Sequence, residues 1–145
     1  MYPLEDFRIL EKAHIDIKSY EYLVGMPYKR KCFDGSGFDC WSLIHHIYSM
    51  NDIELPRNVL DGWSVRKMHK RVEAQRVDWA EVGIEDRREL DVLLFATSRK
   101  LRTHVGLVLN RKYFIHAHSK MNVVIERFAR GFFSGQIYKV YRWQQ

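Results

Sequence analysis

The spacing of the apolar residues changes near residue 90, and this change limits the fold classes open to the chain. Before it, helical spacing predicts helices over residues 4–13, 16–24, 40–50 and 60–74. After it, short apolar runs predict strands over residues 91–96, 103–109, 113–118, 123–127 and 136–143. Residues 78–89 are polar and favour turns. Helices followed by closely connected strands indicate an α+β domain, with N-terminal helices packed on a central antiparallel sheet.

Length and composition are those of one globular domain. The chain has 145 residues, 46% of them hydrophobic and 29% charged, and it shows no internal repeat or linker. We therefore expect a single domain over residues 1–145. No apolar run reaches the ~18 residues of a membrane span, and the first residues lack the basic and apolar regions of a signal peptide. We expect a protein that is made in the cytoplasm, without membrane insertion.

The formal net charge of +6 favours an anionic partner. Nucleic acid, a membrane surface and an acidic cell-wall polymer are the candidates, and a solvated basic surface is the alternative. The basic residues are spread along the chain, with local clusters only at 29–31 and 66–71. None of the common nucleic-acid-binding motifs is present, so we expect no nucleic-acid partner.

A glycine-containing loop leads into Cys40. Helical spacing after this cysteine places Cys40 in the first turn of a helix, with Asp39 as its N-cap. The free N–H groups and the dipole at a helix N-terminus stabilise a thiolate, the nucleophilic form of cysteine. The alternative is a small buried thiol that packs on the inner face of the helix. The second cysteine, Cys32, lies in the preceding loop, and we expect no disulfide between the two.

Two histidines, His104 and His116, lie in adjacent predicted strands joined by a turn at Asn110. If residues 109–111 form the loop, the two histidines stand directly opposite each other, with Cβ atoms about 5 Å apart. His104 would then accept the proton of Cys40, while His116 would hydrogen-bond the other nitrogen of His104 and fix its tautomer. The alternative is that either histidine is a hydrogen-bonded core residue. A zinc site of these three residues is conceivable, but no carboxylate motif accompanies them, so we expect no metal and no cofactor.

Six short motifs occur in order along the chain: Val24-Gly25-Met26-Pro27-Tyr28, Gly37-Phe38-Asp39-Cys40, Ile53-Glu54-Leu55-Pro56-Arg57, Leu90-Asp91-Val92-Leu93-Leu94-Phe95, His104-Val105-Gly106-Leu107-Val108-Leu109 and Phe114-Ile115-His116-Ala117. Their residue types and their order resemble the NlpC-type peptidases, the papain-like cell-wall endopeptidases of bacteria and phages. The separation of twelve positions between Tyr28 and Cys40, and again between His104 and His116, is similar to that in the family. The resemblance implies the papain-like NlpC fold.

The resemblance also implies a role for the polar residues of these motifs. Cys40 would be the nucleophile, His104 the general base and His116 the third polar residue of the site. Tyr28 would lie beside Cys40 and help the backbone N–H of that residue to hold the oxyanion.

The residues on either side of the cysteine complete the predicted site. Asp39 and Trp41 are candidates for oxyanion or substrate contacts, although the side chain of Asp39 is expected to leave the helix away from the sulfur. Trp41 and Ser42 stand where the family usually has Ser-Gly, and Leu90 stands where it has glycine. Tryptophan in the position of Trp41 resembles the phage-tail and gene-transfer-agent branch of the family.

The function implied by the resemblance is a cysteine endopeptidase that hydrolyses peptidoglycan stem peptides at the γ-D-glutamyl–diaminopimelate bond. We expect a phage or prophage tail component that opens the cell wall locally, with peptidoglycan and other tail proteins as partners. It would reach the wall within a virion or by a dedicated secretion route. Three alternatives stay open: a catalytically silent tail-assembly protein of the same fold, a secreted antibacterial amidase effector, and a papain-like acyltransferase or hydrolase with another substrate.

Overall fold

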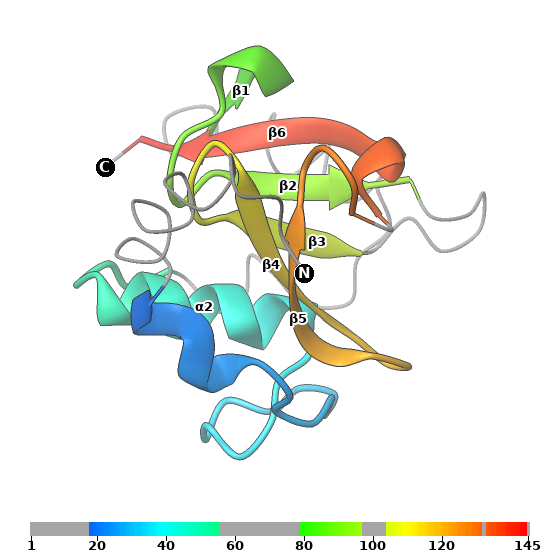
Figure 1. The fold of residues 1–145 in the computed structure, drawn as a ribbon. Helices are drawn as coiled ribbons and strands as arrows, with labels where there is room; N and C mark the ends of the chain where they lie inside the picture. The colour runs from blue at the N-terminus through cyan, green and yellow to red at the C-terminus, as the bar shows by residue number, and fades with distance from the viewer. Residues whose placement is uncertain (1–17, 56–78, 97–103, 132, 145) are drawn as a thin grey trace.

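The computed structural model describes residues 18–55, 79–96, 104–131 and 133–144 (Figure 1). Within these ranges the elements are η1 (Lys18–Leu23), α2 (Cys40–Met50), β1 (Trp79–Val82), η3 (Ile84–Asp86), β2 (Val92–Phe95), β3 (Val105–Val108), β4 (Tyr113–His118), β5 (Asn122–Arg127), η4 (Ser134–Gln136) and β6 (Ile137–Trp143). The strands form one antiparallel sheet in the order β1-β6-β2-β3-β4-β5. This arrangement confirms the predicted α+β class.

The strands expected after residue 90 are all present, with small differences at their ends. Strand β1 lies in the segment that the sequence predicts as turns, and it pairs with β6 at the edge of the sheet. Trp79 is buried and Glu81, on the same face of the strand, is exposed, so these four residues show no alternation from which a strand could be predicted. The 3₁₀ helix η1 replaces the helix expected over residues 16–24. The helices expected over residues 4–13 and 60–74 lie outside the described residues.

The start of α2 follows from a capping box. The side chain of Asp39 accepts hydrogen bonds from the backbone N–H groups of Trp41 and Ser42, and the Ser42 hydroxyl accepts one from the backbone N–H of Asp39. The helix ends at Met50 with Asn51 as its C-cap, and Asp52 follows in a left-handed conformation with φ 60°. Both ends agree with the sequence-based prediction, which places Cys40 in the first turn.

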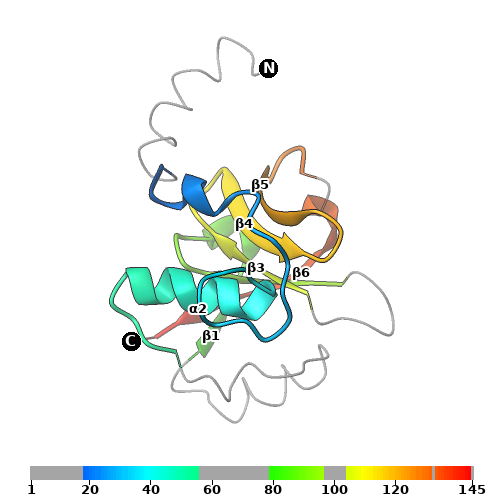
Figure 2. The same ribbon diagram turned by 90° about the horizontal axis from the view of Figure 1, so that it is seen from below.

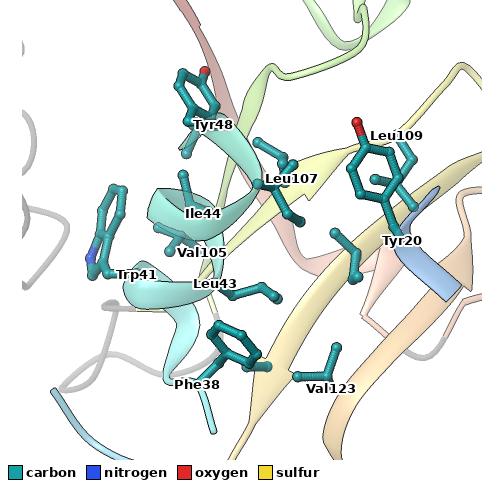
Figure 3. Packing of buried hydrophobic residues seen from close by; sticks show 14 of the residues in the cluster. Tyr20, Phe38, Trp41, Leu43, Ile44, Tyr48, Val105, Leu107, Leu109 and Val123 are labelled. Carbon is teal, nitrogen blue, oxygen red and sulfur yellow. The ribbon is translucent and has the colours of Figure 1, made fainter. Parts of the chain in front are cut away.

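One face of the sheet is covered by α2 and η1 (Figures 1 and 2). Leu43 and Ile44 of α2 are fully buried and belong to the same apolar core as Val105 and Leu107 of β3 (Figure 3). Ile47 of α2 is buried in the same core. Burial of each such side chain contributes about 1.5–3 kcal/mol. This packing holds the N-terminal end of α2 against β3.

The other face of the sheet carries a second apolar cluster rich in phenylalanine. Phe95 of β2, Phe114 of β4 and Phe133 are all buried, and we call these three residues the aromatic cluster. The ring of Phe95 lies 5.7 Å from that of Phe114 and 6.1 Å from that of Phe133, measured between centroids. His116 alternates with Tyr113 and Ile115 along β4 and shares the face of Phe114.

The register of β3 and β4 differs from the predicted hairpin. Val108 pairs with Phe114, two positions beyond the partner expected from a loop of residues 109–111. Continued toward the start of β3, the observed register places His104 level with His118. The predicted direct opposition of His104 and His116 is therefore wrong by two positions.

The turn at Asn110 accounts for this shift. The Oδ1 atom of Asn110 accepts hydrogen bonds from the backbone N–H groups of Lys112 (2.8 Å) and Tyr113 (2.9 Å). The backbone N–H of Leu109 donates to the carbonyl oxygen of Tyr113 (3.0 Å), so the loop is residues 110–112, one position later than expected. Because side chains alternate along a strand, a shift of two positions leaves each side chain on its predicted face. Within the described residues, no helix is long and apolar enough to cross a membrane.

Candidate active site

Cys40 is the first residue of α2, and its sulfur lies next to the backbone of β3. Backbone N–H groups of Val105, Cys40 and Trp41 hydrogen-bond the sulfur and oppose a rise in its pKa. Burial nevertheless raises the pKa of the Cys40 thiol to about 12, with a smaller contribution from the charge of Asp39. The predicted helix N-terminus is present, but burial outweighs its effect, so the resting residue is a neutral thiol. Both cysteines are free.

His104 directly precedes Val105 and is joined to His116. Its Nε2 atom lies 2.8 Å from Nδ1 of His116, at hydrogen-bond distance. Burial lowers the pKa of His104 to about 3, and the proximity of His116 and His118 lowers it further. His104 is therefore neutral at pH 7, and its Nδ1 atom is the ring nitrogen that His116 leaves available.

His116 is fully buried, with rings of the aromatic cluster around it. Its ring centroid is 5.5 Å from that of Phe114 and 4.9 Å from that of Phe133. Burial lowers the pKa of His116 as well. Its Nε2 atom makes a short hydrogen bond with Oε2 of Glu126, from β5.

Glu126 was not among the residues predicted from the sequence. It follows the apolar residues Val123 and Ile125 in a strand where an outward-facing charge is ordinary. The contact between Glu126 and His116 depends on the β4–β5 register. His116 pairs with Val124, and Glu126 lies two residues further along β5, on the same face as Val124. The sequence alone does not give this register. The predicted pair of histidines is therefore a chain of three polar side chains.

Tyr28 reaches the site from a segment that lies along β5. Its backbone N–H donates to Oδ1 of Asn122 (3.1 Å), and it forms an isolated bridge with Phe38. Burial raises the pKa of the Tyr28 phenol, and the nearby Cys40 and Asp39 raise it further. The hydroxyl therefore stays protonated near Cys40, as an oxyanion donor requires.

The two neighbours of the cysteine have structural contacts. Asp39 uses Oδ1 for the helix cap and Oδ2 for the backbone N–H of Lys31, at 2.7 Å. Trp41 is 6% exposed and belongs to the main apolar core (Figure 3). These contacts give both Asp39 and Trp41 a role in the stability of the fold. Their predicted roles in oxyanion or substrate binding stay predictions.

Within the described residues, no group of three or more His, Cys, Asp or Glu side chains is arranged to hold a metal ion. His104, His116 and Glu126 form one hydrogen-bonded chain, the Cys40 sulfur lies at the backbone N–H of Val105, the residue after His104, and the Tyr28 phenol lies near Cys40. This set suits nucleophilic and acid–base chemistry.

The residues of this site fall within one family match. The sequence profile of the NlpC/P60 family matches residues 25–142. The chain belongs to the NlpC/P60 family. The NlpC/P60 match extends over the whole cluster, from Tyr28 to Glu126. No curated protein matches the chain.

Solved NlpC/P60 structures are similar in fold. An NlpC/P60 family protein of Bacillus cereus is 22% identical with a TM-score of 0.64, over 92% of this chain and 40% of that protein. An NLP/P60 family protein of Staphylococcus aureus, described as similar to a lipoprotein, is 20% identical with a TM-score of 0.59, over 91% and 41%. The NlpC/p60 domain of the peptidoglycan hydrolase SagA is 17% identical with a TM-score of 0.58, over 90% and 97%.

These likenesses confirm the papain-like NlpC fold. The chain spans about two fifths of the length of the Bacillus and Staphylococcus proteins. At such identities the structural likeness concerns the fold alone, so the reaction and the substrate depend on the chemistry of the site itself.

Proposed function

We propose that this NlpC/P60 protein is a cysteine peptidase that hydrolyses peptidoglycan stem peptides, at the bond between γ-D-glutamate and diaminopimelate. The observation that carries the reaction type is the contact of the Cys40 sulfur with the backbone N–H of Val105, beside the hydrogen-bonded pair His104 and His116. Family membership and the likeness to the NlpC/p60 domain of a peptidoglycan hydrolase support the substrate.

The reaction begins with removal of the Cys40 proton by Nδ1 of His104. The sulfur attacks the peptide carbonyl carbon, and the carbonyl oxygen becomes an oxyanion held by the backbone N–H of Cys40 and the hydroxyl of Tyr28. Collapse of this intermediate breaks the C–N bond, and the imidazolium of His104 gives its proton to the leaving amine. A thioester remains.

The second half of the reaction regenerates the thiol. His104 takes a proton from water, the resulting hydroxide attacks the thioester carbonyl, and the C–S bond breaks. The proton on His104 returns to the Cys40 sulfur as the carboxylic acid product leaves. Because burial favours the neutral thiol and the neutral imidazole at rest, this mechanism needs no thiolate–imidazolium pair before the substrate binds.

The proposal includes a biological setting, a phage or prophage tail that opens the wall locally. The support is the tryptophan at position 41 in place of the family's serine, and a net charge of +6 that suits an anionic wall. The protein would be made in the cytoplasm and act at the wall with other tail proteins.

The test is mass spectrometry of the fragments released from purified diaminopimelate-type sacculi. The wild type should produce new ends at the glutamyl–diaminopimelate bond, and Cys40→Ala should produce none. Cys32→Ala is the matched control, because Cys32 lies in the loop with its thiol near Asp34, and it should cleave like the wild type. Release of the same fragments by the wild type and by Cys40→Ala would contradict the mechanism. New ends at another bond would correct the assignment of the scissile bond.

A second candidate is favoured by one observation, the burial that keeps Cys40 and His104 uncharged. A catalytically silent tail-assembly protein of the same fold would tolerate such a site. It predicts no release from sacculi by the wild type and full particle assembly by a phage that carries Cys40→Ala.

A further inference from the structure

We infer that Glu126 is a positioning residue that sets the direction of the hydrogen-bond chain through His116 and so leaves Nδ1 of His104 free to accept a proton. This inference rests on the proposed function, because it assigns His104 as the base. It extends the site by a carboxylate that acts through a histidine and does not itself touch the substrate.

The geometry is a diagonal across three neighbouring strands. His104 stands level with His118, yet it bonds to His116, two positions away on β4. His116 in turn pairs with Val124, yet it bonds to Glu126, two positions away on β5. Each diagonal neighbour lies within reach of a long side chain on the same face. The side chains therefore form one continuous line from the start of β3 to β5.

The direction of this line follows from proton counting. A carboxylate can only accept hydrogen bonds, so the Nε2 atom of His116 must carry the proton that it shares with Glu126. In a neutral imidazole the other nitrogen then accepts, so Nδ1 of His116 accepts from the Nε2–H of His104. The remaining nitrogen of His104, Nδ1, is left with a lone pair. A group that donated at position 126 would reverse every step and place a proton on that atom.

The surroundings hold Glu126 in this role. Its side chain is 12% exposed, and its Oε1 atom accepts a hydrogen bond from the backbone N–H of Phe133 at 3.4 Å. Gly131 closes over the carboxylate, because a Cβ atom there would lie 3.1 Å from Oε1 of Glu126 and 2.5 Å from the carbonyl oxygen of Arg127. The chain thus approaches Glu126 at a point where only glycine fits.

The aromatic cluster excludes water from His116, so the carboxylate of Glu126 acts on the hydrogen bonds of that imidazole without competition from solvent. Phe95, Phe114 and Phe133 surround His116 and leave it fully buried, so within the described residues its hydrogen-bonding partners are His104 and Glu126. When His104 receives the thiol proton, the negative charge of Glu126 stabilises the imidazolium through His116. Loss of this charge should weaken the base as well as disturb its tautomer.

The experiment is the variant Glu126→Gln, which keeps the shape and removes the charge. Two-bond ¹H–¹⁵N spectra of protein labelled with ¹⁵N-histidine distinguish the Nδ1–H and Nε2–H tautomers. In the wild type, His104 and His116 should both be Nε2–H. In Glu126→Gln, a population with Nδ1–H on His104 should appear, and kcat on the stem peptide should fall by roughly 10- to 100-fold, as for carboxylates that orient metal-bound histidines, with KM little changed.

Two further variants separate positioning from folding. Glu126→Asp keeps the charge and should recover part of kcat and the wild-type tautomers. Glu81→Gln is the matched control, because Glu81 pairs with Lys139 on the surface and its side chain is 55% exposed, and it should behave as the wild type.

The outcomes are distinguishable. Unchanged tautomers together with an unchanged kcat in Glu126→Gln, or an Nδ1–H tautomer of His104 in the wild type, would overturn the assignment of Glu126. The wild-type spectrum tests the assignment even if Glu126→Gln does not fold. If the wild type releases nothing from sacculi while the tautomers respond to Glu126→Gln, the proposed function fails and the control of the histidine chain by Glu126 stands.

Discussion

Gly106 lies against His116 so closely that a Cβ atom at position 106 would be 3.3 Å from the Cβ atom of His116. The same added atom would lie 3.0 Å from Cε2 of Phe95 and 3.2 Å from the carbonyl oxygen of Ile115. Glycine at this place in β3 therefore leaves room for the buried imidazole and for the aromatic cluster.

We predict that Gly106→Ala destabilises the protein by about 1–3 kcal/mol, because the added methyl group overpacks a tight face of the sheet. Urea denaturation measures the change. Gly83→Ala is the control, since the nearest atom to its added Cβ is 3.7 Å away, and its effect should stay within about 0.5 kcal/mol. Equal effects of the two variants would contradict the packing described around His116.

Asp39→Ala should lower the free energy of unfolding by about 0.5–2 kcal/mol, because the N–H groups of Trp41 and Ser42 lose their cap. Asp39→Asn should retain most of the stability, since asparagine also caps helices. Thermal denaturation followed by circular dichroism is the measurement. A loss in Asp39→Asn as large as that in Asp39→Ala would point to the carboxylate charge instead of the cap.

The alkylation rate of Cys40 by iodoacetamide should rise about tenfold per pH unit between pH 6 and 9, because burial raises the pKa of this thiol to about 12 and the thiolate is the reactive form. A Cys32→Ser background isolates the signal. A rate that levels off within this range would show a thiolate–imidazolium pair at rest.

Stability should fall as the pH falls below about 6.5. Burial lowers the pKa of His104 to about 3, while the unfolded chain binds the proton near pH 6.5. Between these values the unfolded state holds more protons, so acid favours unfolding, by at most about 1 kcal/mol per pH unit for a partly exposed histidine. Urea denaturation from pH 7.5 to 5 should give a shallower slope for His104→Gln. An identical slope in both proteins would contradict the neutral histidine.

Tyr28→Phe should lower kcat on the stem peptide about 100-fold or more with little change in KM, as expected for loss of an oxyanion donor. Tyr22→Phe is the control, because Tyr22 is 61% exposed and its hydroxyl bonds to His46 on the outer side of α2. Steady-state kinetics measures both. A rise in KM with kcat unchanged would assign Tyr28 to substrate binding instead.

Much of the fold was predictable from local patterns. The helical spacing after Cys40 and the capping residues Asp39 and Ser42 are neighbours in sequence, so the start of α2 could be read directly. The strands after residue 90 were also predicted from local sequence, because each is a short apolar run. Strand β1 was missed because its four residues carry too little periodicity, and only its pairing with β6 makes it a strand.

In the candidate site, too, local features were predictable from the sequence and contacts between distant residues were not. By itself, the sequence predicted the candidate chemical residues Cys40, His104, His116 and Tyr28, since their motifs and spacing are local properties. Tertiary structure decided the rest. The β3–β4 register could shift by two positions without changing any face, so only the paired strands show that His104 meets His116 on a diagonal. Glu126 joins the chain only through the β4–β5 register, and burial, a property of the packed molecule, makes the thiol and imidazoles neutral.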